Sequence, residues 1–123
     1  MNLPPTKTEI VKILIVDDQA EARQMTKLFL GDSTFEFKEC ADGADAVECF
    51  ERIHPDWILM DWKMNGMSGL EATRRIVAAH PEARILMLTQ YDDAEMRRAA
   101  AEAGARGYVL KENLFSLGAF LGV

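Results

Sequence analysis

Cysteine is scarce in this sequence of 123 residues, which contains only Cys40 and Cys49. Two cysteines are too few for a disulfide framework, and no other ligands stand near them at the spacing of a metal site. We therefore expect both cysteines to be buried free thiols.

Long apolar runs are also absent, and basic residues are fewer than acidic ones. No segment is long enough to cross a bilayer, and residues 1–10 contain no hydrophobic signal core. The 14 lysines and arginines against 20 aspartates and glutamates give a net charge of −6, which argues against nonspecific binding to nucleic acid or anionic membranes. These absences favour a cytoplasmic domain that binds neither nucleic acid nor membrane directly.

Beyond residue 10 the chain has no linker, repeat or low-complexity segment, and its length suits one domain. The polar residues 1–10 predict a flexible leader, followed by a single domain over residues 11–123. Apolar runs typical of buried strands alternate with segments of helical periodicity. The predicted strands span residues 11–16, 35–40, 57–60, 85–88 and 108–110, and the predicted helices span residues 19–30, 42–52, 68–79, 92–103 and 114–121. Five such units predict an α/β fold with a single doubly wound, five-stranded parallel sheet.

Polar residues follow the predicted strands at their carboxyl ends. Asp17 and Asp18 follow the first strand, Asp61 follows the third, Thr89 the fourth and Lys111 the fifth. Because the carboxyl ends of parallel strands lie at one edge of a sheet, where ligands of this fold class bind, these side chains are expected to gather there.

This set of residues suits phosphoryl transfer to a carboxylate. Three neighbouring carboxylates repel one another, and Mg²⁺ relieves that repulsion while leaving a position for a phosphate oxygen. Lys111 supplies a positive charge for Asp61 or for a phosphoryl group, and Thr89 supplies a hydrogen-bond donor. We therefore interpret Asp61 as a phosphoryl acceptor. Taken singly, Asp18 is also explained as a helix N-cap, Thr89 as the end of a strand and Lys111 as a solvated charge.

At this point the sequence resembles a response-regulator receiver domain of bacterial two-component signalling, over nearly everything from residue 11 onward. The matching segments are VDD at 16–18 with Arg23 following, DWKMNGMSG at 61–69, LT at 88–89 and GYVLK at 107–111. Residues 91–114 are similar to receivers whose full-length forms carry a LuxR-type helix-turn-helix, and we expect no such output domain in this chain.

The resemblance implies a flavodoxin-like sheet with strand order 2-1-3-4-5 and specific roles for the gathered residues. It implies phosphorylation of Asp61, Mg²⁺ held by Asp17, Asp18, Asp61 and the backbone carbonyl of Lys63, and a phosphoryl contact from Lys111. It also implies that Thr89 and Tyr108 form a switching pair. The expected partner is a sensor histidine kinase or a phosphotransfer protein, and a homodimer through the fourth helix, fifth strand and last helix is compatible with the family. Such a domain catalyses its own phosphorylation and dephosphorylation without being a conventional enzyme.

Two departures from the family pattern bear on rate and loop geometry. Asn65 stands where proline is usual, which predicts a less rigid loop, and Gln90 replaces a usually small residue, which predicts slower phosphoryl exchange. A haloacid-dehalogenase-type phosphatase would need an aspartate at Lys63, and a flavodoxin-like electron carrier would need a phosphate loop in place of Asp17 and Asp18. A degenerate receiver that acts as a phosphorylation-independent interaction module stays open as the alternative function.

Overall fold

The computed structural model describes residues 10–31 and 34–121, and these form a five-stranded parallel sheet. The strands are β1 (Val11–Val16), β2 (Phe35–Cys40), β3 (Trp57–Asp61), β4 (Ile85–Thr89) and β5 (Gly107–Leu110). Their spatial order is β2-β1-β3-β4-β5. Both the predicted doubly wound fold and the implied strand order are confirmed.

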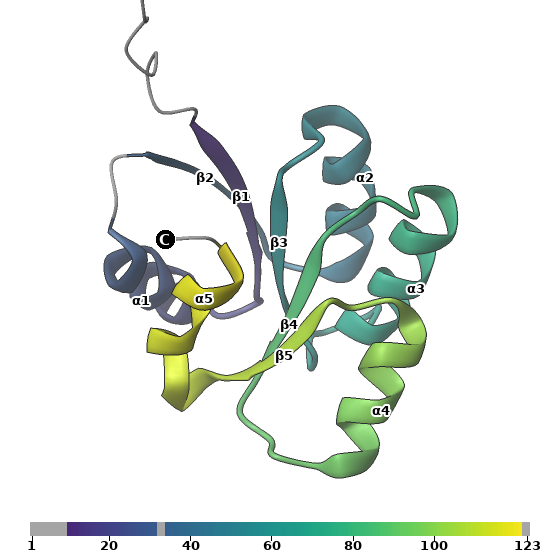
Figure 1. Ribbon diagram of the computed structural model, residues 1–123. Helices are drawn as coiled ribbons and strands as arrows, with labels where there is room; N and C mark the ends of the chain where they lie inside the picture. The colour runs from purple at the N-terminus through teal and green to yellow at the C-terminus, as the bar shows by residue number, and fades with distance from the viewer. Residues whose placement is uncertain (1–9, 32–33, 122–123) are drawn as a thin grey trace, which may run out of the picture.

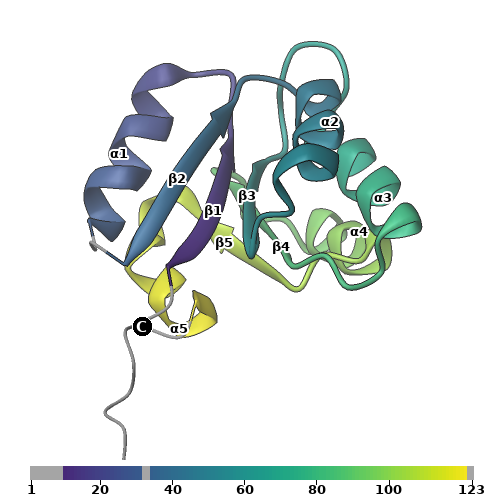
Figure 2. The same cartoon turned by 90° about the horizontal axis from the view of Figure 1, so that it is seen from above.

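Helices cover both faces of the sheet, as the near-continuous apolar strands predicted. The helical segments are α1 (Ala20–Leu30), α2 (Gly43–Ile53), α3 (Gly69–Ala79), α4 (Ala94–Ala103), the 3₁₀ segment η1 (Lys111–Ser116) and α5 (Leu117–Leu121). Helices α1 and α5 lie on one face, and α2, α3 and α4 lie on the other (Figures 1 and 2). Among the described helices, none has the length and apolar character that a bilayer span requires.

Alternate residues of each strand enter two separate cores. In β1, Leu14 and Val16 join the cluster with buried residues of α2, α3 and α4, whereas Ile13 and Ile15 join the cluster with Leu117 of α5. All four β1 side chains are at most 1% exposed. Parallel pairing with β2 and β3 fixes the direction of β1, and hence the edge from which its terminal residues leave the sheet.

Most predicted helix boundaries agree with the structure within one or two residues, and the last helix is the exception. At the start of α3, the Ser68 hydroxyl accepts a hydrogen bond from the Glu71 amide at 3.1 Å, as the predicted capping pattern requires. The predicted helix over residues 114–121 is wrong at its beginning, because Lys111–Ser116 forms a 3₁₀ segment interrupted at Asn113 (φ −118°, ψ 45°). The Ser116 hydroxyl donates to the Asn113 carbonyl at 2.9 Å and stabilises this interruption. The predicted leader lies outside the described residues except for the exposed Ile10.

Candidate functional site

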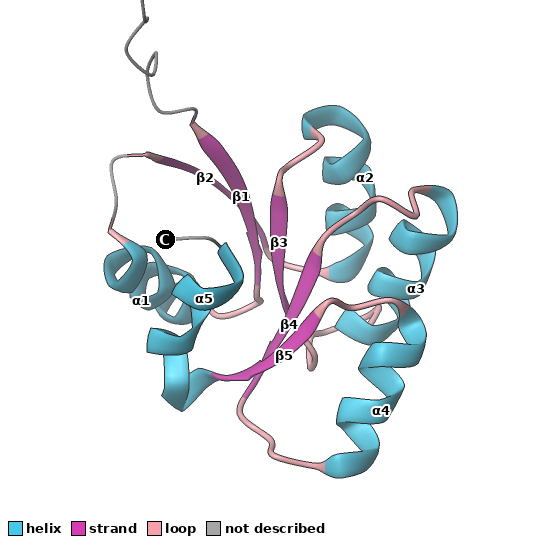
Figure 3. Ribbon diagram, in the orientation of Figure 1, coloured by secondary structure: helices cyan, strands magenta, loops and turns pink. Residues whose placement is uncertain are grey.

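The predicted polar residues meet at the carboxyl edge of the sheet. Asp61 and Thr89 are the last residues of β3 and β4, Asp17 follows β1, and Lys111 follows β5. At this edge β1, β2, β3 and β4 each continue into a loop, whereas β5 continues directly into the 3₁₀ segment η1 (Figure 3). The parallel register pairs Asp61 with Leu88 and Thr89 with Leu110, so the strand ends lie alongside one another.

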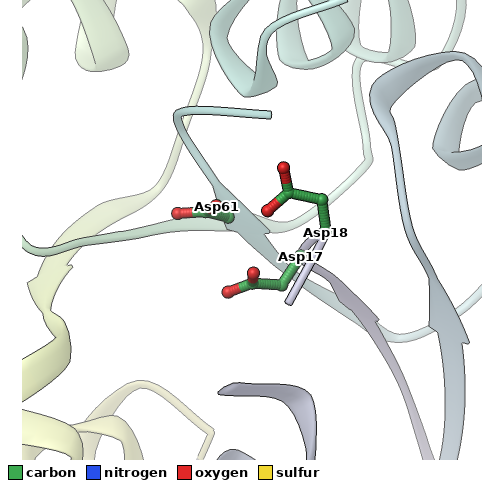
Figure 4. Close-up of side chains that lie close together, drawn as sticks. All are labelled: Asp17, Asp18 and Asp61. Atoms are coloured by element: carbon green, nitrogen blue, oxygen red, sulfur yellow. The ribbon is translucent and has the colours of Figure 1, made fainter. Parts of the chain in front are cut away.

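Three carboxylates form a compact cluster at this edge. One oxygen from each of Asp17, Asp18 and Asp61 lies within 4.8 Å of the other two, and this is the only such group of potential metal ligands among the described residues. Figure 4 shows the side chains leaving the ends of β1 and β3 toward a shared space. Asp17 is 3% and Asp61 7% exposed, whereas Asp18 is partly exposed. A set of hard oxygen donors of this kind fits Mg²⁺.

Lys111 neutralises part of this negative charge. Its Nζ lies 2.8 Å from Asp17 Oδ2 and 3.1 Å from Asp61 Oδ1. Burial alone would lower the pKa of Lys111, but the hydrogen bond to Asp17 and the charges of the two aspartates raise it above its ordinary value. Lys111 is therefore not a solvated charge, and it stands where a group added to Asp61 would meet it.

Backbone contacts fix Asp17 and leave Asp18 available. The Gln19 amide donates to Asp17 Oδ1 at 2.9 Å, and the Arg23 guanidinium donates to the Asp17 carbonyl at 2.6 Å. Helix α1 begins after Gln19, which makes no side-chain capping hydrogen bond. The alternative that Asp18 is the helix N-cap is therefore wrong.

The surroundings of Asp61 change the pKa of its carboxyl group. Burial, reinforced by the negative charge of Asp17, raises its pKa to about 6, and Lys111 opposes the shift. A carboxylate that is buried beside other carboxylates gains more than an exposed one from a cation or from a neutralising reaction partner.

A cavity of about 320 Å³ opens above Asp61. Its lining is Asp18, Gln19, Asp61, Lys63, Thr89, Gln90, Tyr91 and Lys111. The ammonium of Lys63 lies 5.4 Å from the centroid of the Tyr91 ring, so the β3–α3 loop meets the β4–α4 loop over the cavity. Tyr91 was not predicted from the sequence, although its position two residues after Thr89 is a usable signal.

Thr89 and Tyr108 are linked through the backbone of Tyr91. Thr89 is 1% exposed, and its hydroxyl accepts from the Tyr91 amide at 3.2 Å. The Tyr108 hydroxyl donates to the Tyr91 carbonyl at 2.5 Å, and the Arg97 guanidinium lies 4.6 Å from the Tyr108 ring centroid. Burial raises the pKa of Tyr108, which keeps this hydroxyl a donor. Tyr108 is thus held against the β4–α4 loop.

The β3–α3 loop is fixed at its far end by a close backbone approach. The Gly69 amide donates to the Trp62 carbonyl at 2.8 Å, and Gly66 adopts φ +78°. Asn65, two residues after Lys63, is exposed in this loop. That the Lys63 carbonyl is a metal ligand stays a prediction.

The chain is similar to proteins of one known family. Residues 13–116 match the model of the response regulator receiver domain. The chain is 39% identical over 105 residues to the transcriptional regulatory protein DegU of Brevibacillus brevis, covering 83% of this chain and 44% of DegU. It is also 39% identical over 104 residues to the oxygen regulatory protein NreC of Staphylococcus carnosus, covering 82% of this chain and 48% of NreC. The chain spans about half the length of these curated relatives.

Solved structures show the same fold. A two-component response regulator of the LuxR family from Aurantimonas sp. SI85-9A1 superposes with a TM-score of 0.84 at 30% identity, covering 93% of this chain and 86% of the other. The receiver domain of the NarL regulator from Mycobacterium tuberculosis gives 0.85 at 26% identity, covering 94% and 96%. The chain therefore belongs to the response regulator receiver domain family of two-component signalling proteins.

Proposed function

We propose that this domain is a phosphorylation switch in which Asp61 accepts a phosphoryl group from a sensor histidine kinase or a phosphotransfer protein. The observation that carries the proposal is the position of the Asp61 carboxylate. It lies in an open cavity, beside two further carboxylates and 3.1 Å from the Lys111 ammonium. Asp17, Asp18, Asp61 and the Lys63 carbonyl would hold Mg²⁺, which supplies charge neutralisation for the transferred phosphoryl group.

The chain's own groups account for the remaining chemistry. An Asp61 oxygen attacks phosphorus, the bond from phosphorus to the donor's imidazole nitrogen breaks, and that nitrogen takes up the electron pair. Lys111 then exchanges its contact with Asp61 for one with a phosphoryl oxygen, and the Thr89 hydroxyl donates to another. Hydrolysis of the aspartyl phosphate returns Asp61 to its starting state, so the domain turns over its own phosphate without being a conventional enzyme.

The phosphoryl group would change a distant surface through Thr89. When the Thr89 hydroxyl turns toward the phosphoryl group, the Tyr91 amide loses its 3.2 Å acceptor and the loop that holds Tyr108 loosens. Tyr108 then turns inward, and the surface formed by α4, β5 and α5 changes. That surface is the proposed contact for a second receiver or another partner. Phosphorylation can shift this equilibrium only by interacting differently with the two states.

A thermal-unfolding comparison tests the proposal. Mg²⁺ together with beryllofluoride, a phosphoryl mimic, should raise the Tm of the wild type, because ligands that bind only the folded chain stabilise it. The rise should need both components and should vanish in Asp61→Asn. An unchanged wild-type Tm would favour the phosphorylation-independent interaction module instead.

A further inference from the structure

The two cysteines, nine residues apart in the chain, meet in the core between the sheet and α2. Cys40 is the last residue of β2 and Cys49 lies on α2, and both thiols are free and buried, at 5% and 8% exposure. The Cys40 thiol donates to Cys49 Sγ at 2.9 Å. A disulfide needs sulfur atoms about 2.0 Å apart, so the two are within about 1 Å of bonding distance.

The surroundings of the two sulfur atoms differ. The Arg52 guanidinium donates to Cys49 Sγ at 3.3 Å, and a guanidinium at that position stabilises negative charge on sulfur. Burial and the contact with Cys49 raise the pKa of the Cys40 thiol far above its ordinary value, so Cys40 stays a donor. Arg52 itself is exposed at the surface, and Cys49 keeps 8% exposure of its own.

We propose that Cys40 and Cys49 form an oxidative modification site, at which a hydroperoxide converts the two thiols into an intramolecular disulfide. Cys49 sulfur, having released its proton to water, attacks one peroxide oxygen. An S–O bond forms, the O–O bond breaks, and with hydrogen peroxide the leaving hydroxide gains a proton to become water. Cys40 sulfur then attacks Cys49 sulfur, so that an S–S bond forms and the S–O bond breaks. Hydroxide leaves and takes the Cys40 proton as a second water. Two thiols lose two electrons, and the peroxide gains them.

The cross-link would join the end of β2 to α2 at the carboxyl edge of the sheet. The Asp17 amide donates to the Cys40 carbonyl at 3.1 Å, so the oxidised pair borders the backbone that positions Asp17. The link restricts the unfolded chain, and the oxidised protein should therefore unfold at a higher temperature than the reduced protein. None of the proposed steps uses Asp61, so Asp61→Asn should oxidise like the wild type.

Mass spectrometry of the intact chain tests the proposal. The reduced protein, freed of reductant, is treated with hydrogen peroxide, then denatured and alkylated to mark any remaining thiols. The expected product is a monomer lighter by two hydrogen atoms, free of alkylation and restored by dithiothreitol. Cys40→Ser and Cys49→Ser should not form it. Arg52→Gln should slow its formation severalfold, whereas the matched control Arg74→Gln, on α3, should not.

Two results would overturn the proposal. One is a wild-type chain that stays a dithiol, or that gains oxygen atoms or forms intermolecular dimers in place of the internal bond. The other is an Arg52→Gln variant that oxidises at the wild-type rate, which would overturn the assignment of Cys49, beside the guanidinium, as the attacking sulfur. The first result concerns the unmodified chain, so it does not depend on any variant folding correctly.

Discussion

At the scale of single residues, access to Asp61 depends on the side chains around its cavity. Gln90 is exposed and lines that cavity with Tyr91. Gln90→Ala should therefore accelerate phosphoryl exchange, by about two- to fivefold, which corresponds to a barrier change below about 1 kcal/mol. Acetyl phosphate labelling, followed through the fluorescence of the neighbouring Trp62, measures the rate. Gln24→Ala on α1 is the control, and equal rates for Gln90→Ala and the wild type would contradict the prediction.

Arg23 connects Asp17, at the carboxyl edge of the sheet, to an ion pair on the surface. Its guanidinium donates to the Asp17 carbonyl and to Glu39, which also accepts from Lys27 at 2.6 Å. The hydrogen bonds from Lys27 and then Arg23 lower the pKa of Glu39. A carboxyl whose pKa is lower in the folded state stabilises the fold above its unfolded pKa, and loses that contribution as pH falls through the folded value.

Glu39→Gln should consequently cost stability at neutral pH and little in acid. Because the Glu39 side chain is about one-third exposed (33%), solvent screening limits the expected loss to roughly 0.5–1 kcal/mol near pH 7. Urea unfolding of both proteins at about pH 7 and pH 3 measures the difference. Glu36→Gln is the matched control, since Glu36 pairs with Lys38 at 3.8 Å and its side chain is more exposed than that of Glu39. A loss that stays constant across this pH range would rule out the ion pair as its source.

At the scale of elements, the first residue of α3 must be glycine to hold Asp61 in place. A Cβ on Gly69 would lie 1.9 Å from the Asp61 carbonyl oxygen, so an alanine there forces the backbone apart. Gly69→Ala should lose about 1–3 kcal/mol of stability and weaken the response to Mg²⁺ with beryllofluoride. Gly66→Ala is the control, because its Cβ meets no atom within 4 Å and only its φ of +78° is unfavourable. It should cost about 1 kcal/mol and keep the response. Equal effects of the two variants would argue against the close approach.

The strands made part of the site predictable from the sequence, whereas the packing of the segments after them was not predictable. Asp17, Asp61 and Thr89 were predictable as neighbours because parallel strands end at one edge, which requires only the strand assignments. The pairing of Lys111 with Asp61 was also expected, but its shorter contact with Asp17 was not, since that contact depends on the direction that the chain takes after β5. The 3₁₀ segment there escaped prediction for the same reason. The burial of Cys40 and Cys49 as free thiols is confirmed, but their mutual approach depends on how α2 packs against β2.

At the scale of the whole molecule, the loop between β4 and α4 connects the carboxyl edge of the sheet to the surface formed by α4 and β5. Tyr91 donates its amide to Thr89 on the site side and accepts from Tyr108 on the surface side. The loop between β4 and α4 is exposed from Gln90 to Asp93, whereas β4 is buried along its whole length. A change at Asp61 is therefore expected to move this loop while the sheet stays in place.

Amide hydrogen exchange can detect that local movement. Mg²⁺ with beryllofluoride should speed exchange at the Tyr91 amide and change it through α4, because Thr89 withdraws the acceptor of that amide. Helix α2 lies farther along the same face, and its exchange should follow only the overall gain in stability. Asp61→Asn should show neither effect. Uniform slowing over the whole chain, with no faster exchange at Tyr91, would mean that the phosphoryl mimic binds without moving Thr89, and the coupling from Asp61 to Tyr108 would then need another route.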